Sequence, residues 1–230
     1  MVRTSKLTRR ASTNEYSIAH LRDVKSPEIH PIIIGAHSRV HDTVRIRPGC
    51  VISAYSTVDA ECELENSVGA YVHLNTHCRL GRGARLGYLI SEYAKDPPAD
   101  TKATIVVGAN SQIGTAARIY PNTILMDSVQ VGNGAEIGML SMQKIKEFTT
   151  TEIDRACQIG KGAVIMSGVK LAEQIEVEPY TIIPSALSHH FIDQRNITIT
   201  PKMIQEMLPK KHPAKYTYLD QVKARQKAVG

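Results

Sequence analysis

An aliphatic residue recurs at every sixth position through most of the chain. The repeat begins at Ile34, steps forward by only four residues between Leu64 and Val68, and is interrupted after Leu86 and after Ile137. It contains 21 hexads, which begin at Ile34, Val40, Ile46, Ile52, Val58, Leu64, Val68, Leu74, Leu80, Leu86, Val107, Ile113, Ile119, Leu125, Val131, Ile137, Ile159, Ile165, Leu171, Val177 and Ile183. A period held over so many units indicates a repeat architecture.

The other positions of the hexad support the same register. The fifth residue is small or medium-sized in most hexads, and the second is often glycine. One large aliphatic and one small inward residue in every six predict short strands joined by tight turns. No hexad buries its face alone, so successive turns of a solenoid must stack. With three hexads in each triangular turn, the 21 hexads give about seven turns, and the strand spacing of ~4.8 Å gives a prism roughly 33 Å long.

Several segments carry a family resemblance. The order aliphatic, glycine, two variable residues, a small residue and a variable residue resembles the hexapeptide-repeat transferases, and "VGNGAEIG" (131–138), "IGKGAVIMSGVKL" (159–171) and "RIRPGCVIS" (45–53) are the closest matches. The resemblance covers residues 34–188. It implies a left-handed parallel β-helix, a homotrimer, and acyl transfer from acetyl-CoA or another acyl-CoA to a sugar or nucleotide-sugar.

Two interruptions break the repeat. Residues 88–106 contain two prolines and several charges, and we expect them to form an external loop. Residues 143–158 are polar, and we expect a second loop there with room for a short helix. Long insertions in a solenoid are where function usually concentrates, and in the family such loops reach a neighbouring subunit.

The chain after residue 188 predicts a helical cap. Thr200 is placed as an N-cap before Pro201, and a second, strongly basic helix is expected to follow. The predicted units are a basic N-terminal arm (1–33), the β-helix (34–188) and the cap (189–230). A β-helix with a basic helical tail resembles the UDP-N-acetylglucosamine acyltransferases of lipid A synthesis, which makes acyl carrier protein a second candidate donor. The H-x-x-H-D-C-type signature of those enzymes is absent.

Acyl transfer needs a base that takes a proton from the attacking amine or hydroxyl, and histidine is the usual choice. If the hexads at Val58 and Leu74 share one face, Glu61 and His77 stack one strand spacing apart, and the carboxylate orients the imidazole. "LNTHCRLG" (74–81) resembles the stretch that carries the catalytic histidine of bacterial sugar N-acetyltransferases, although Thr76 stands at the usual histidine position.

The remaining site predictions follow from these. His73 is the reserve base and Asn75 is a nearby polar contact for the substrate. Lys161 and Lys170 are candidate contacts for the phosphates of the acyl-CoA, as compact charges. The cysteines Cys50, Cys62 and Cys78 fall on the small inward position and are predicted to be packing residues, whereas Cys157 falls outside the register. No CxxC pair is present, so we expect no structural zinc site or disulfide framework, and a cytoplasmic protein.

Two other functions remain open. His37 and His41, and His73 and His77, are pairs spaced by four, and a few related β-helix proteins hold zinc and act as carbonic anhydrases; that chemistry requires three convergent histidines. The second alternative is a non-catalytic hexapeptide scaffold.

Charge and hydropathy narrow the partners. The net charge is +6, but the excess of positive charge lies at the two ends, with no interleaved aromatics beyond Tyr216 and Tyr218, which argues against nucleic acid. No stretch reaches the ~20 apolar residues of a membrane helix, and the start does not resemble a signal peptide. We therefore expect no membrane insertion.

Overall fold

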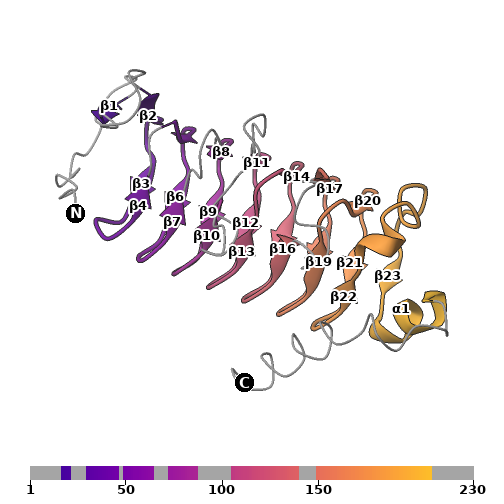
Figure 1. The fold of residues 1–230 in the computed structure, drawn as a ribbon. Coiled ribbons are helices and arrows are strands. Elements are labelled where there is room, and N and C mark those ends of the chain that lie inside the picture. Colours follow the sequence, from indigo (N-terminus) through magenta and orange to yellow (C-terminus); the bar gives the residue numbers. More distant parts are fainter. Residues whose placement is uncertain are drawn as a thin grey trace.

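The computed structural model describes residues 17–21, 30–46, 49–64, 72–87, 105–139 and 149–208. These residues form a three-sided solenoid in which the chain winds through three sheets in turn and rises by one strand per circuit (Figure 1). One circuit through all three sheets is called a coil below. Apart from the β1–β2 pair, neighbouring strands are parallel. The architecture is the predicted left-handed parallel β-helix.

The first sheet has eight strands and the second also has eight, whereas the third has seven. The first contains β1 (Ser17–Leu21), β2 (His30–Ile34), β5 (Val51–Ile52), β8 (Val72–Leu74), β11 (Ile105–Val107), β14 (Thr123–Leu125), β17 (Thr151–Ile153) and β20 (Lys170–Leu171). The second contains β3 (Arg39–Val40), β6 (Thr57–Val58), β9 (Arg79–Leu80), β12 (Gln112–Ile113), β15 (Gln130–Val131), β18 (Gln158–Ile159), β21 (Glu176–Val177) and β23 (Thr198–Ile199). The third contains β4 (Arg45–Ile46), β7 (Glu63–Leu64), β10 (Arg85–Leu86), β13 (Arg118–Ile119), β16 (Glu136–Met139), β19 (Val164–Met166) and β22 (Ile182–Ile183).

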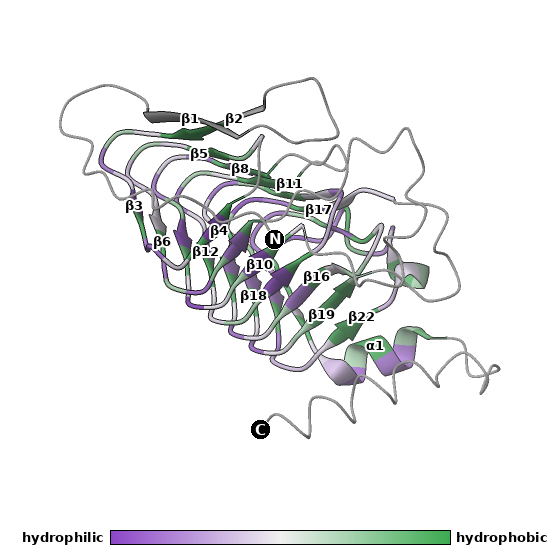
Figure 2. Ribbon diagram, turned by 60° about the vertical axis from the view of Figure 1, so that its left-hand side comes forward, coloured by the Kyte–Doolittle hydropathy of each residue, from purple (hydrophilic) through white to green (hydrophobic). Residues whose placement is uncertain are grey.

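The repeated aliphatic residues fill the interior. Leu64, Leu74, Leu80, Leu86 and Leu125, for example, have no exposed surface. Alternate residues of a strand point to opposite faces, so the residue before each inward aliphatic faces out. These outward residues differ among the sheets: β5 and β11 of the first sheet are hydrophobic throughout, whereas β10 and β16 of the third mix hydrophilic and hydrophobic residues (Figure 2).

One step of the predicted register is wrong. Leu74 pairs with Ile52 in the first sheet, and Val58 pairs instead with Leu80 in the second. The ten residues from Leu64 to Leu74 therefore make a single step from the third sheet to the first. Val68, which was counted as a hexad of its own, lies outside the described residues.

One hexad that the sequence analysis did not count lies in the segment predicted as the second loop. Thr151–Ile153 form β17, which pairs with β14, and Gln158–Ile159 form β18. Residues 149–158 contain no helix, and residues 143–148 of the predicted loop lie outside the described residues. Ile153 is fully buried and begins a hexad whose fifth residue, Cys157, is also fully buried. Cys157 is therefore in register, and the earlier interpretation of it is corrected.

The C-terminal end of the solenoid is closed by short elements. A 3₁₀-helix (Ser185–Leu187) follows β22, and β23 adds a last strand to the second sheet. Helix α1 (Pro201–Met207) then packs against β22, with Ile204 buried. The predicted cap is confirmed at Thr200, whose hydroxyl accepts a hydrogen bond from the Met203 amide. Residues 1–16 of the basic arm and the second, basic helix lie outside the described residues.

Candidate functional site

Three aromatic rings stack along one edge of the solenoid. His37, Tyr55 and His77 occupy the same position in three successive turns that lead from the first sheet to the second. Their ring centroids are 5.0 Å apart at each step, with interplanar angles of 13° and 10°. All three residues have positive φ, near 60°. In each pair an amide of the upper turn donates to the turn below, as from His77 to the Ala54 carbonyl at 3.2 Å.

The proposed base His77 is exposed, and it is held by stacking on Tyr55. Among the described residues its ring nitrogens have no hydrogen-bond partner, so they are available to a substrate. Tyr55 is itself 55% exposed, and His37 covers its other face. This stack of His37, Tyr55 and His77, called the aromatic ladder below, therefore fixes the plane of the His77 imidazole through ring contacts.

Glu61 does not stack on His77. It lies on the next edge of the solenoid, between the second and third sheets, where it accepts a 2.5 Å hydrogen bond from Arg82. This contact and the Arg82 charge lower the pKa of the Glu61 carboxyl. The predicted pairing fails because Leu74, which precedes His77, belongs to the first sheet rather than to the sheet of Val58.

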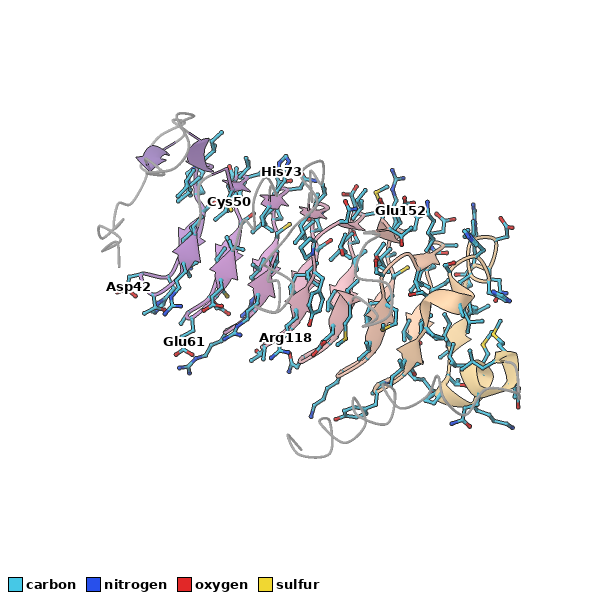
Figure 3. All side chains as sticks on the ribbon, in the orientation of Figure 1. Asp42, Cys50, Glu61, His73, Arg118 and Glu152 are labelled. Carbon is cyan, nitrogen blue, oxygen red and sulfur yellow. The ribbon has the colours of Figure 1, made fainter. Side chains whose placement is uncertain are left out.

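His73 and Asn75 flank the first sheet. His73 is the outward residue of β8, between Val51 and Val106, and it is half-buried. In Figure 3 His73 and Glu152 lie along one edge of the view and Glu61 along the opposite one. Asn75 stands two residues after His73 and two residues before His77, at the start of the turn that leads to Cys78.

A groove of about 430 Å³ runs along the outer face of the second sheet. Its outward strand residues are Arg79, Gln112, Gln130, Gln158 and Glu176, which are directly paired from strand to strand. Glycines at the adjoining turns form the neighbouring part of its lining, at Gly81, Gly114, Gly132 and Gly160. The groove thus offers a row of amide donors and acceptors beside bare backbone.

The glycines are required by the close stacking of turns. A Cβ at Gly132 would lie 2.6 Å from the backbone nitrogen of Lys161 in the coil above. The same conflict with backbone atoms recurs at the other three glycines of the groove. The shape of the groove is therefore a consequence of the repeat itself.

The two lysines predicted to contact phosphate lie on different faces. Lys161 is exposed in the turn between Gly160 and Gly162, next to the groove. Lys170 is the outward residue at the end of the first sheet, and its Nζ donates to Glu152 at 2.9 Å. One bound phosphate therefore cannot contact both side chains within a single chain.

All four cysteines are buried packing residues. Their thiols donate to backbone carbonyls, as Cys157 does to Ala172 at 3.0 Å. Burial raises the pKa of Cys78 and of Cys157 to about 11 and also raises that of Cys62. Neutral thiols of this kind are poor nucleophiles and poor metal ligands.

The histidine pairs do not converge within one chain. His37 and His77 are separated by Tyr55, whereas His41 contacts Asp42 and Thr43 at another edge. Within the described ranges, no group of three or more His, Cys, Asp or Glu side chains is placed to hold a metal ion. No helix in the same ranges is long and apolar enough to span a membrane.

Two features of the site were missed in the sequence. The sequence analysis does not single out Tyr55 as a site residue. Tyr55 nevertheless stands at the same place in its hexad as His37, which lies eighteen residues before it. The glutamines of the groove each directly precede a repeated aliphatic residue, at Ile113, Val131 and Ile159. The signal that would have revealed the groove was the return of glutamine just before the aliphatic residue of every third hexad, as at Gln112 and Gln130, eighteen residues apart.

Comparison with solved structures finds similar proteins at low sequence identity. A UDP-N-acetylglucosamine acyltransferase from Bacteroides fragilis is 17% identical, over 73% of this chain and 65% of that chain, with a TM-score of 0.26. The enzyme from Campylobacter jejuni is 16% identical over 85% and 82%, with a TM-score of 0.27. That from Francisella novicida is 15% identical over 84% and 87%, with a TM-score of 0.21.

The match spans slightly less than two thirds of the Bacteroides fragilis protein. No protein-family model matches the chain, and no curated protein matches its sequence. The strand order of the three sheets shows the left-handed parallel β-helix fold.

Proposed function

We propose that the protein transfers an acyl group, acetyl in the first instance, from an acyl-CoA to an amino or hydroxyl group of a sugar or nucleotide-sugar. The observation that carries the proposal is the exposed His77 imidazole on one edge of the second sheet, whose outer face holds the groove. His77 lies two residues before Arg79, which lines the end of the groove. A donor that extends from the groove across the narrow second sheet would reach the opposite edge, where the base is available.

His77 is the proposed general base. A neutral ring nitrogen takes the proton of the acceptor as its nitrogen or oxygen attacks the thioester carbonyl. The carbon–sulfur bond then breaks, the acyl group remains on the acceptor, and CoA leaves as a thiolate that regains a proton. Tyr55 positions the ring by stacking. His73 on the adjoining sheet remains the reserve base.

The groove suits the donor. The arm of CoA carries two amides, and the row Gln112, Gln130 and Gln158 presents matching donors and acceptors along the second sheet. Lys161 beside the groove is the proposed phosphate contact, and Asn75 a contact for the acceptor. A phosphate contact by Lys170 stays a prediction, and the ion pair of Lys170 with Glu152 does not favour it. Acyl carrier protein remains the alternative donor, and homotrimer assembly in the cytoplasm remains part of the proposal.

Ligand-induced stabilisation tests the proposal. A ligand that binds only the folded protein raises its melting temperature with concentration. We expect acetyl-CoA or a longer acyl-CoA to do so, and zinc to have no such effect. Gln130→Leu should abolish the shift with CoA, because it removes the middle amide of the row. Gln205→Leu, an exposed site on α1, is the matched control.

The outcomes separate the alternatives. No stabilisation by any acyl-CoA would overturn the proposal and leave a non-catalytic scaffold. Stabilisation by zinc alone would instead support a metal-dependent activity. A shift that Gln130→Leu and Gln205→Leu leave equally intact would place the donor outside the groove.

A further inference from the structure

The outward residues of the second sheet change in character along the solenoid. Direct strand pairing aligns Arg39, Thr57 and Arg79 in the first three coils. The same row continues through Gln112, Gln130, Gln158, Glu176 and Thr198. The positive charges of this face are thus confined to its first three coils, where Arg39 and Arg79 are exposed.

The two arginines differ from most others in their contacts. Arg45, Arg82, Arg85, Arg118 and Arg195 each contact a carboxylate. Among the described residues, Arg39 and Arg79 have no such partner, although Asp59 lines the groove together with Arg79. The hydroxyl of Thr57, between them, is also without a hydrogen-bond partner in that part of the chain. Three donors on one row thus remain available.

We propose that Arg39, Thr57 and Arg79 form a binding site for the phosphate or pyrophosphate of a small ligand. The two arginines lie two strand spacings apart, about 10 Å between their Cα atoms, and long side chains can close over one anion from both sides. Each planar guanidinium donates two parallel hydrogen bonds to phosphate oxygens. The Thr57 hydroxyl donates a further one from between them.

The row favours a small ligand over a polyanion. A nucleic acid presents a phosphate at every residue and binds along a continuous basic surface. Here the next three residues of the row are neutral glutamines and the following one is Glu176. The cationic segment therefore matches one phosphate or pyrophosphate group. Binding at this site can be tested apart from the proposed acyl transfer, because pyrophosphate has no acyl group to transfer.

Titration calorimetry with inorganic pyrophosphate tests the site. We expect saturable binding by the full chain that weakens as salt is added, and a dissociation constant about tenfold or more higher in Arg39→Gln and in Arg79→Gln. Glutamine is already the residue of this row in the next coils, so both variants should keep the fold, which circular dichroism checks. Arg155→Gln removes an exposed arginine from the sixth coil and should bind as the wild type does.

Two further ligands identify the source of the phosphate. CoA and UDP, titrated in the same way, distinguish a donor phosphate from that of a nucleotide acceptor by which one shows the same dependence on Arg39 and Arg79. Absence of saturable binding at millimolar pyrophosphate would overturn the proposal. So would equal weakening in Arg155→Gln, which would reveal attraction to net charge alone.

Discussion

The ring of Tyr55 stacks on that of His77, with 5.0 Å between the ring centroids and an angle of 10° between the ring planes. The two side chains meet because the strands that precede them, β5 and β8, are neighbours in the first sheet. This contact replaces the expected one between His77 and Glu61. It makes the aromatic ladder the feature that orients the proposed base.

Replacement of Glu61 tests this assignment. Glu61→Gln removes the carboxylate that pairs with Arg82 on a different edge of the solenoid. We expect the rate of acyl transfer to stay within about twofold of the wild-type rate, because Glu61 does not contact His77, whereas loss of a general base typically costs 10²- to 10⁴-fold. Steady-state kinetics with acetyl-CoA measure this. A loss of tenfold or more would restore Glu61 to the catalytic site.

The row of glycines predicts that two substitutions two residues apart differ sharply in their effect on stability. Gly132→Ala would place a Cβ 2.6 Å from the Lys161 backbone nitrogen, whereas a Cβ at Gly134 meets nothing within 4 Å. We expect Gly132→Ala to lower the free energy of unfolding by about 3 kcal/mol or more, because backbone must move. Gly134→Ala, strained only by its positive φ, should lower it by about 1 kcal/mol. Denaturant titration compares them; equal effects would contradict the stacking.

The hexad at Ile153 can be tested in the same way. Ile153→Ala would leave a cavity in the interior of the sixth coil, and the expected loss is about 2–5 kcal/mol. Glu152→Ala, the outward neighbour on the same strand, loses only an ion pair that is 40% exposed at each partner and should change stability by less than about 1 kcal/mol. A small effect of Ile153→Ala would mean that this segment is not part of the solenoid.

Cysteine reactivity follows from burial. The pKa of Cys78 and of Cys157 is raised to about 11, so only a minute fraction of each is thiolate at neutral pH. The thiolate is the reactive species. We expect the folded protein to resist alkylation at pH 8 and all four cysteines to react once it is denatured, as mass spectrometry would show. Rapid labelling of Cys157 in the folded state would contradict its inward position.

The sequence predicts the solenoid well because its period is enforced by packing. Each interior site accepts a large aliphatic residue, and that requirement is visible in the chain without any structure. The site was harder to predict because it depends on which hexads share a sheet. An aliphatic residue at Val68 allowed a step of four, although the chain takes ten residues from Leu64 to Leu74 in one step. Because of this one step, the prediction placed His77 on the same edge of the solenoid as Glu61, whereas His77 lies on the edge between the first and second sheets.

The hexad at Ile153 was concealed for a related reason. The residues before it, "EFTTTE" (147–152), are polar apart from Phe148, and nothing aliphatic stands six positions earlier. Only its later positions, Cys157 and Ile159, carried the register. The side-chain contacts of Tyr55 and of the glutamine row follow once the coils are aligned, so they depended on the same step.

Release of the CoA thiol is the most direct measure of the proposed activity. Acetyl-CoA should be consumed only when a sugar or nucleotide-sugar acceptor is added, and His77→Ala should slow this release by about 10²- to 10⁴-fold while acetyl-CoA still raises the melting temperature. His37→Ala, at the far end of the same ladder, should retain most of the rate. Turnover in His77→Ala equal to that of the wild-type protein would contradict the assignment of His77 as the base.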